Sequence, residues 1–409
     1  MQRVEFTDAF FDGMQSSILD VNQSETLLPA CYTDPSFFEF EREAIFLREW
    51  LCVGREAWIR EPGEYFTASH VGEPLIIVRN QDGRIKALSA VCQHRAMLVA
   101  EGSGKTRSFL CPYHHWAYSL DGQLLGAPAM ERAQDFDKSR IRLPEIKVES
   151  WFGFIFVNFD ADAAPLAPRL APLADVLKNY DVASAEEPSR PGDLQTEHWN
   201  WKIRVENFND GYHANRLHAG PVHDICPSHL ASFPELPGDC AGYLRFNKTI
   251  HPDASFNPTL KAILPVFPGL TPEERHRMLF INILPSLFIV GRSETLTYNI
   301  FFVHGPEHMS SQRGWMVPPE TTRQPLFKER LQLNVDGSKP IFEQDRHVDE
   351  MVQIGLRSRY AARGRYSWQE QSQSDLNKWL VKRYRSYWAE HKSSANGRAA
   401  PWEPPRHRE

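Results

Sequence analysis

Residues 92–114 of this 409-residue chain read CQHRAMLVAEGSGKTRSFLCPYH. The stretch begins with Cys92-x-His94 and, after sixteen further residues, ends with Cys111-x-x-His114. Two Cys/His pairs at this separation predict two tight loops that bring four metal ligands to one site. Such a set has two well-known uses. It holds a structural zinc ion in a tetrahedral Cys₂His₂ site, or a [2Fe–2S] cluster in which the cysteines bind one iron and the histidines bind the other.

The residues around the two pairs favour the cluster. The neighbouring segments are strand-like, whereas a zinc finger needs two strands followed by a helix. Pro112, Tyr113 and Trp116 would wall the second loop with apolar groups, and a dry environment helps to set a reduction potential. His115 competes with His114 as a ligand, but adjacent residues of an extended segment point apart, so we keep His114. Zinc stays open as the alternative.

Composition excludes several classes of protein. The chain is 42% hydrophobic and 24% charged, which is ordinary for a folded globular protein and excludes coiled coil or long disorder for the whole chain. Its net charge of −6 gives no basic field that would attract nucleic acid. The N-terminal residues lack the features of a signal peptide, and no run reaches the roughly 18 apolar residues of a membrane span. We expect a cytoplasmic protein that binds neither nucleic acid nor membrane.

The pattern along the chain changes several times. Asp34 and Pro35 predict the start of a helix, because the first can cap it and the second suits its first position. Short strands follow, including a hairpin within 75–88. The Ala- and Pro-rich stretch 161–172 is interpreted as a linker. A final helical part is predicted to begin near Phe342.

A second group of candidate ligands stands in Asp210-Gly-Tyr-His213-Ala-Asn-Arg-Leu-His218. Apolar residues at i, i+4, i+7 and i+11 from Trp201 to Tyr212 predict one face of a helix here. On an undistorted helix the two histidines would point about 140° apart. Both therefore reach one ion only if the helix bends or ends between them. Two histidines and one carboxylate form a facial triad for Fe(II), which leaves positions open for O₂.

A candidate for the carboxylate lies in the later helix, at 342–353. Four apolar residues define the stripe that we expect to be buried: Val348, Met351, Val352 and Leu356. Asp345 falls about 45° from the centre of this stripe and Asp349 about 85°. Because a buried carboxylate is unfavourable unless it is paired or bound to metal, Asp345 is the expected third ligand and Asp349 the reserve. An acid that only faces the positive end of the helix dipole remains the alternative for Asp345.

These motifs together resemble the large (alpha) subunit of Rieske non-haem iron oxygenases. The resemblance covers most of the chain, from about 28 to 359. The four Cys/His ligands match the family's Rieske signature, 210–218 matches its motif Asp-x-x-His-x₄-His, and Asp345 matches its distant third ligand. Two independent motifs in this order favour the cluster over zinc more strongly than the first motif alone. Gln93 and Ala96 depart from the Arg and Gly of many relatives.

The resemblance implies an α+β fold. A β-rich Rieske [2Fe–2S] domain, residues 45–158, would be inserted in a helix-grip catalytic domain of residues 1–44 and 159–392, in which an antiparallel sheet wraps a long helix. Residues 393–409, rich in Pro, Ser and charge, are expected to form a disordered tail. The resemblance also implies a homotrimer, in which Asp210 hydrogen bonds to a histidine of each site and so bridges the cluster of one subunit to the iron of its neighbour.

The function predicted on this basis is that of a terminal oxygenase component. The cluster would pass single electrons to Fe(II) held by His213, His218 and Asp345, where O₂ hydroxylates or oxidatively demethylates a small aromatic compound or alkylamine. No dinucleotide-binding G-x-G-x-x-G follows a strand, so NADH electrons would arrive through a separate flavin/iron–sulfur reductase or ferredoxin. Two alternatives stay open: a zinc-dependent hydrolase with a structural Cys₂His₂ site, and a redox carrier without oxygenase activity.

Overall fold

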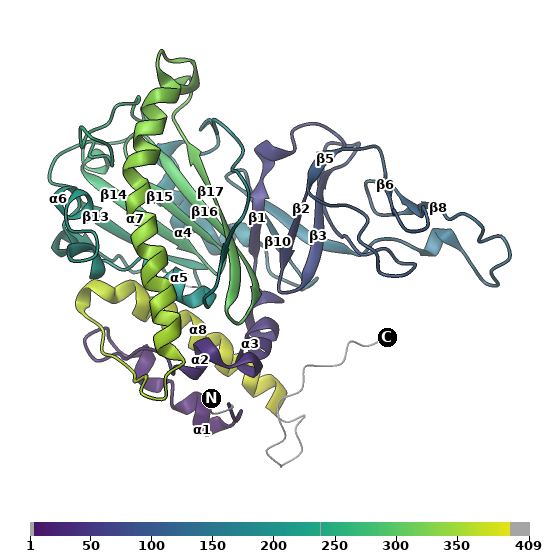
Figure 1. Cartoon of the computed structure of the whole chain (residues 1–409), viewed down its shortest axis with the longest axis horizontal. Helices are drawn as coiled ribbons and strands as arrows, with labels where there is room; N and C mark the ends of the chain where they lie inside the picture. The colour runs from purple at the N-terminus through teal and green to yellow at the C-terminus, as the bar shows by residue number, and fades with distance from the viewer. Residues whose placement is uncertain (1–3, 238, 393–409) are drawn as a thin grey trace. The chain divides into compact units, whose positions relative to one another are not determined.

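The computed structural model describes residues 4–237 and 239–392, which divide into two compact units (Figure 1). Unit 2 comprises Phe46–Leu166 and Phe302–His304, and unit 1 comprises the other described residues. Most of unit 2 is thus inserted in the sequence of unit 1. The predicted disordered tail, 393–409, lies outside the described residues.

Unit 2 is built from strands. A seven-stranded antiparallel sheet has the order β1-β10-β9-β4-β3-β2-β5, and a small second sheet has the order β6-β7-β8. The hairpin predicted within 75–88 is confirmed, because β3 pairs antiparallel with β4. The strands are β1 Leu51–Arg55, β2 Glu64–His70, β3 Glu73–Arg79, β4 Ile85–Ser89, β5 Ser103–Lys105, β6 Phe109–Leu110, β7 Ala117–Tyr118, β8 Leu124–Gly126, β9 Glu145–Trp151 and β10 Phe154–Asn158.

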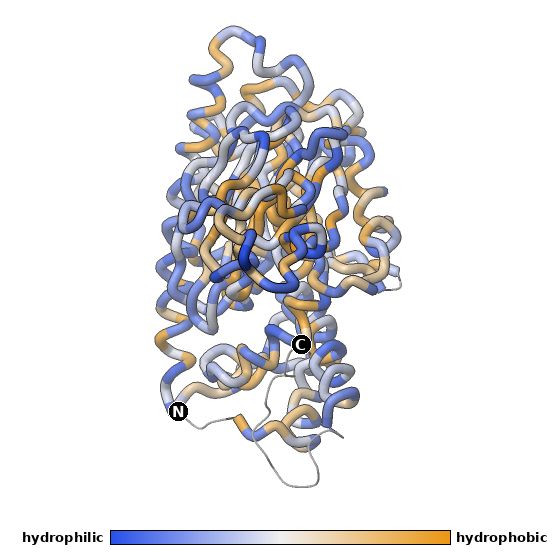
Figure 2. Tube along the Cα trace, turned by 90° about the vertical axis from the view of Figure 1, so that its right-hand side faces the viewer, coloured by the Kyte–Doolittle hydropathy of each residue, from blue (hydrophilic) through white to orange (hydrophobic). Residues whose placement is uncertain are grey.

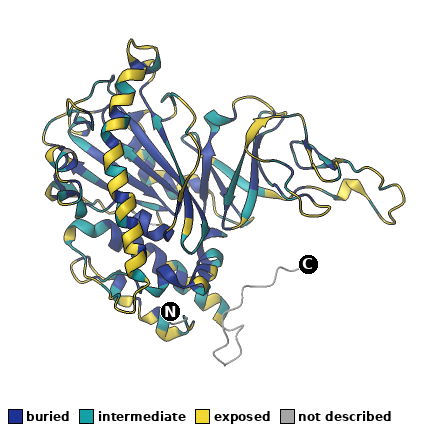
Figure 3. Cartoon of the chain, in the orientation of Figure 1, coloured by how far each residue is buried: buried dark blue, intermediate teal, exposed yellow. Residues whose placement is uncertain are grey.

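Unit 1 contains a second seven-stranded sheet, with the order β11-β17-β16-β15-β14-β13-β12. The long helix α7, Phe327–Leu356, lies across this sheet, and consecutive residues of the central strands are buried, so both faces of these strands are covered (Figures 1 and 3). Such burial explains why these strands are almost continuously hydrophobic instead of alternating. The strands are β11 Gln195–Glu197, β12 Ala231–Ser232, β13 Gly242–Lys248, β14 Arg277–Ile283, β15 Leu287–Gly291, β16 Leu296–Gly305 and β17 His308–Met316.

One row of side chains crosses this sheet in register. Arg245 of β13 pairs with Phe280 of β14, which pairs with Val290 of β15, and Val290 pairs with Thr297 of β16. Directly paired residues of neighbouring strands project from the same face. These four residues therefore form a continuous strip on one face of the sheet.

Helix α7 is longer than predicted and buries a different face. It runs from Phe327 to Leu356, and not from Phe342. The predicted apolar stripe is wrong, since Met351 and Val352 are 44% and 41% exposed. Polar residues are buried in its place. After Phe327, the buried residues of the helix are all polar: Asn334, Ser338, Asp345, Asp349 and Gln353.

The early part of α7 was missed because Gly337 and Pro340 are typical helix breakers. Pro340 lies inside the helix. A Cβ atom at Gly337 would overlap the backbone oxygen of Phe256, so only glycine lets the helix approach this loop so closely.

Residues 161–172 are not simply a linker, because helix α4 spans Leu166–Leu177. The Ala- and Pro-rich composition concealed a helical spacing of i, i+4, i+7 and i+11. The residues at this spacing are all buried: Leu166, Leu170, Leu173 and Leu177. The remaining helices are α1 Asp8–Asp12, α2 Ala30–Thr33, α3 Pro35–Glu41, α5 Trp201–Phe208, α6 Pro221–Ile225 and α8 Gln371–His391.

A buried ion pair joins the N-terminal helices of unit 1 to α5. The predicted helix start is confirmed, since the Asp34 side chain caps α3 by accepting a hydrogen bond from Ser36 N at 2.7 Å. At the other end of α3, the Glu41 carboxylate accepts hydrogen bonds from Lys202 Nζ at 2.7 and 2.8 Å, and neither side chain is exposed to solvent. Tyr384 of α8 donates to the same carboxylate. The pair thus fixes α5, the helix that leads into the second group of candidate ligands.

No helix among the described residues is both long enough and apolar enough to span a membrane. Figure 2 shows hydrophilic and hydrophobic residues alternating along the helices.

Lys202→Met should lower the free energy of unfolding of unit 1 by about 3 kcal/mol or more, because it leaves the Glu41 carboxylate buried without its cation. Urea denaturation followed by tryptophan fluorescence measures the change. Lys378→Met is the matched control, since Lys378 pairs with Asp375 at the surface and should contribute less than about 1 kcal/mol. Equal effects of the two substitutions would contradict the role given to the buried pair.

Candidate functional site

The two Cys/His pairs of unit 2 lie on two loops with matching backbone geometry. In the first loop, Ala96 N donates to Cys92 O at 3.0 Å and Cys92 N donates to Met97 O at 2.9 Å. In the second loop the residues four and five positions after Cys111 make the same two bonds, at 2.9 and 2.8 Å. Ala96 and its counterpart His115 both have a left-handed backbone, with φ of 55° and 59°. Glycine fits that conformation without strain, whereas a residue with a Cβ atom adopts it only rarely.

The ligand side chains of these loops differ in burial by type. Cys92 and Cys111 are buried, whereas His94 is exposed and His114 is half-buried. The two histidine rings lie close together, with centroids 4.5 Å apart. His114 Nδ1 is buried and has no hydrogen-bond partner, so this nitrogen is available to a metal. The structure thus brings His114, and not the exposed His115, beside His94.

Aromatic groups surround the two loops. The Trp116 ring stacks on His94 at 4.7 Å, as expected for an apolar wall. The hydroxyl of Tyr118 accepts a hydrogen bond from Gln93 N at 3.0 Å and lies 3.3 Å from Cys92 Sγ. Since its single proton is not used by Gln93, the hydroxyl can donate to the sulfur. Burial raises the pKa of Tyr118, which keeps this proton in place.

The second group of ligands follows the end of α5 in unit 1. The helix stops at Phe208, so the expectation that Tyr212 continues its buried face is wrong, and Tyr212 is 56% exposed. His213 begins a short 3-10 turn and His218 follows in a loop. This break removes the angular conflict of an undistorted helix, because the two rings can now turn toward one point.

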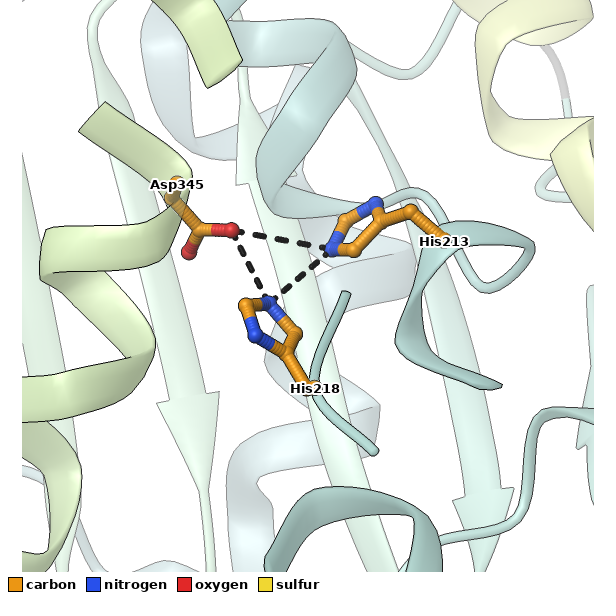
Figure 4. Close-up of side chains that lie close together, drawn as sticks. All are labelled: His213, His218 and Asp345. Carbon is orange, nitrogen blue, oxygen red and sulfur yellow. Dashed lines mark hydrogen bonds and ion pairs between the residues drawn. The ribbon is translucent and has the colours of Figure 1, made fainter. Parts of the chain in front are cut away.

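Asp345 of α7 completes the group (Figure 4). Its Oδ1 lies 2.9 Å from Nε2 of His218 and 3.7 Å from Nε2 of His213, and the two Nε2 atoms are 3.2 Å apart. Among the described residues, this is the only set of three or more His, Cys, Asp or Glu side chains whose ligand atoms lie within 4.8 Å of one another.

The outer nitrogens of both rings are engaged with acceptors. His213 Nδ1 donates to Asp210 Oδ2 at 2.8 Å, and His218 Nδ1 donates to Gln344 Oε1 at 2.8 Å. Both Nε2 atoms are therefore unprotonated in the neutral rings and direct lone pairs at each other and at Asp345 Oδ1, which is buried without a hydrogen-bond partner. Three electron-rich atoms in this position repel one another unless a proton or a metal cation lies between them. The donor set fits a metal such as Fe(II), held by two histidines and a carboxylate.

Asp210 affects the charge state of His213. Burial disfavours the imidazolium, but the hydrogen bond and charge of Asp210, together with the charge of Asp345, outweigh it and raise the pKa of His213. A carboxylate at Nδ1 also fixes the orientation of a ligating ring.

Asp349, the reserve ligand, is not part of this group. Its Oδ2 pairs with Arg204 Nη1 at 2.9 Å, and Arg204 Nη2 also donates to Glu197 at 3.0 Å. Burial, with the like charges of Asp345 and Glu197, raises the pKa of Asp349 to about 8 against the opposing effect of Arg204. The Arg204 contacts hold α5 against α7.

A pocket of about 740 Å³ opens beside the three ligands. The strip across the sheet forms part of its wall, from Arg245 to Thr297. Segment 280–290 contributes three residues to the lining, and segment 298–303 contributes none. The aromatic residues of the lining are Phe208, Phe256, Phe280, Phe288, Trp315 and Phe342.

Sequence reasoning missed several residues of the two sites. Gln344, Tyr118 and Arg292 carry no local motif, and each is placed by contacts with residues distant in sequence or on another element. Of the three, only Arg292 could have been found from the sequence, by the alternation of residues along a strand. Arg292 stands two residues after Val290 and four after Phe288. Residues at this spacing project from the same face of a strand.

Two family matches cover most of the chain. Residues 179–386 match the family described as "Ring hydroxylating alpha subunit (catalytic domain)", and residues 49–144 match the Rieske [2Fe-2S] domain. The first match covers about half of the sequence and includes His213, His218 and Asp345. The second includes both Cys/His loops.

Curated relatives match part of the chain. The carnitine monooxygenase oxygenase subunit of Acinetobacter baumannii is 34% identical over 197 residues, which are 46% of this chain and 51% of the relative. The glycine betaine monooxygenase oxygenase subunit of Chromohalobacter salexigens is 34% identical over 228 residues, 52% of this chain and 51% of the relative. The chain thus spans about half the length of these relatives.

The fold is also that of a solved structure. A quaternary ammonium Rieske monooxygenase superposes with a TM-score of 0.76 over 94% of this chain and 100% of its own, at 24% identity. This likeness, together with the helices and the two seven-stranded antiparallel sheets, confirms the α+β fold predicted from the resemblance. With the matches to both domains, the chain belongs to the family of ring-hydroxylating alpha subunits, the large subunits of Rieske non-haem iron oxygenases.

Proposed function

We propose that this chain is the terminal oxygenase component of a Rieske system, which uses O₂ and NADH-derived electrons to hydroxylate or oxidatively demethylate a small organic substrate. Cys92, His94, Cys111 and His114 would hold the [2Fe–2S] cluster. The observation that carries the proposal is the convergence of His213 Nε2, His218 Nε2 and Asp345 Oδ1 at the edge of an aromatic pocket. Three protein ligands on one side of an ion leave positions open toward that pocket.

The spread of the Cys/His ligands supports a cluster over zinc. A tetrahedral zinc ion would draw its four ligand atoms to within about 4 Å of one another, given bond lengths of about 2.0–2.3 Å. Within the described ranges, no three of these four side chains meet inside 4.8 Å. A two-iron cluster separates its cysteines from its histidines and tolerates this wider spacing. The convergent second site also argues against a simple electron carrier, which needs only the first.

The protein contributes geometry and a dry environment. When bound, the cluster supplies single electrons and the iron supplies O₂ activation. Asp210 and Gln344 fix the rings of His213 and His218 through their Nδ1 protons. Phe208 stacks on Phe288 at 4.6 Å in the pocket lining, and such aromatic pairs exclude water from the reacting position.

The finer parts of the proposal concern substrate and partners. Relatives that are named for carnitine and glycine betaine support an alkylamine as substrate more than an aromatic hydrocarbon. A separate reductase or ferredoxin would deliver the electrons. We further propose a homotrimer in which the Asp210 carboxylate, already bound to His213, also accepts a hydrogen bond from a cluster histidine of the neighbouring subunit.

Oxygen consumption by the iron-loaded protein with NADH and a reductase tests the proposal. Addition of an N-methylated amine from a panel should start O₂ uptake and yield a hydroxylated or demethylated product. Protein without substrate should consume little O₂. If no panel compound raises O₂ uptake although the cluster is reduced by the partner, the protein is a carrier and not an oxygenase.

Asp345→Ala should remove iron from the mononuclear site, because two histidines alone bind Fe(II) weakly. Iron analysis should show the loss of this ion while the visible absorption of the cluster persists. Glu343→Ala is the matched control, since this acid on the same helix is exposed and should leave the iron content unchanged. Retention of the iron by the Asp345 variant would mean that another residue is the third ligand.

Asp210→Asn should leave both metal centres filled but lower turnover by at least tenfold, about the effect of losing a partner of a ligating histidine. Steady-state O₂ uptake and metal analysis on the same sample measure both quantities. Asp224→Asn changes an exposed acid nearby and should keep full activity. Full activity of the Asp210 variant would remove its proposed role.

A further inference from the structure

The pocket beside the three ligands contains a cation that no part of the proposed reaction uses. Arg292 follows β15 directly and continues the alternation of Phe288 and Val290, so it faces the same side of the sheet. All three line the pocket. The Arg292 side chain is almost fully buried, with 2% of the residue exposed.

The guanidinium of Arg292 is only partly satisfied by the protein. Its Nε donates to Thr295 Oγ1 at 3.1 Å, whereas Nη1 is buried and has no hydrogen-bond partner. Two rings of the pocket lining flank the group, Phe256 at 5.3 Å and Trp315 at 5.1 Å. Aromatic rings stabilise a cation but accept no strong hydrogen bond from it. The donor at Nη1 therefore lacks an acceptor of its own.

Glu294, the acid whose charge acts on Arg292, is bound to other groups. The Glu294 carboxylate accepts hydrogen bonds from the Asn334 side chain at 3.0 Å, from Ile263 N and Leu264 N at 2.7 Å each, and from the Ser255 hydroxyl. Its charge opposes the effect of burial only partly, since burial still lowers the pKa of Arg292 to about 10. The positive charge is retained at neutral pH without a direct counter-charge.

The other charges of the pocket lining are already engaged. Arg245 donates to the amide oxygens of Asn209 at 3.2 Å and Asn247 at 3.5 Å, and it packs over Phe280. Asp210 and Asp345 face the two histidines. Arg292 thus stands out among the charged groups of the lining by a buried donor that has no hydrogen-bond partner.

We infer that the substrate of this enzyme carries a carboxylate, which binds Arg292 while the rest of the molecule extends along the aromatic wall toward His213, His218 and Asp345. A carboxylate supplies the acceptor that Nη1 lacks, and guanidinium and carboxylate match each other as bidentate partners. The same cation disfavours a substrate whose only charge is a quaternary ammonium. This inference deepens the proposed function and rests on it for the identity of the pocket as the substrate site.

Anaerobic titration calorimetry on the metal-loaded protein tests the inference with two matched pairs of probes. Glycine betaine and choline share a quaternary ammonium, but only the first has a carboxylate. Phenylacetate and phenylacetamide share an aromatic ring, and again only the first is an acid. In at least one pair the acid should bind more tightly, and the pair that responds tells whether the acid is an amino acid betaine or an aromatic acid.

Arg292→Gln should weaken binding of the preferred acid about ten- to a hundredfold, while binding of the partner that lacks the carboxylate should not weaken. Arg292→Lys keeps the charge and should recover part of the loss, which separates charge recognition from misfolding. Arg277→Gln is the control, because Arg277 also stacks on a ring, Phe246, but does not line the pocket.

Three results would overturn the inference: tighter binding of both probes that lack a carboxylate, equal weakening of both members of a pair by Arg292→Gln, or no binding of either acid at millimolar concentration. These results are independent of the proposed function. Substrate-dependent O₂ uptake by the wild-type protein with an amine that lacks a carboxylate would support the oxygenase function and contradict the carboxylate inference. Tight acid binding without any O₂ uptake would support the carboxylate inference and contradict the oxygenase function.

Discussion

Two imidazole nitrogens 3.2 Å apart, next to a buried carboxylate oxygen, form an arrangement that needs a positive charge between them, either a proton or a metal cation. Asp210 and Gln344 enforce it, because each accepts the Nδ1 proton of one ring and so leaves the opposite nitrogen bare. Two helices position the three ligands. Helix α5 ends at Phe208 so that both rings can turn inward, and α7 lies across the sheet so that Asp345 meets them.

The same requirement explains the unusual inward face of α7. A helix that covers a sheet ordinarily buries an apolar stripe, but this one buries polar residues. Three of these residues have partners that compensate their burial. Asn334 donates a hydrogen bond to Glu294, and Asp349 forms an ion pair with Arg204. Gln353 accepts a hydrogen bond from Asn200 N at 2.7 Å. Polar pairing of this kind fixes the rotation of α7 about its axis, and therefore the direction of Asp345.

Local spacing predicted the parts of the site that are close in sequence. The two Cys/His loops, the hairpin within 75–88 and the pair His213 and His218 follow from short-range patterns, and the family matches confirm the resemblance that these patterns indicated. Asp345 was selected by a wrong argument, since the apolar stripe used to orient the helix is exposed.

Residues placed by long-range contacts left no such trace in the sequence. The start of α7 was obscured by Gly337 and Pro340, whose positions make sense only beside the loop at Phe256. Gln344 is recognisable only once His218 is in place. The domain limits, the ligand assignments and the trimer stay predictions.

Electron paramagnetic resonance of the anaerobically purified protein, before and after dithionite, with iron and zinc counted, tests the central claim most directly. A loaded Rieske oxygenase should give a rhombic signal on reduction and contain more iron than the two atoms of a [2Fe–2S] cluster, because Fe(II) occupies a second site. A colourless protein that contains only zinc, and stays silent after reconstitution with iron and sulfide, would contradict it.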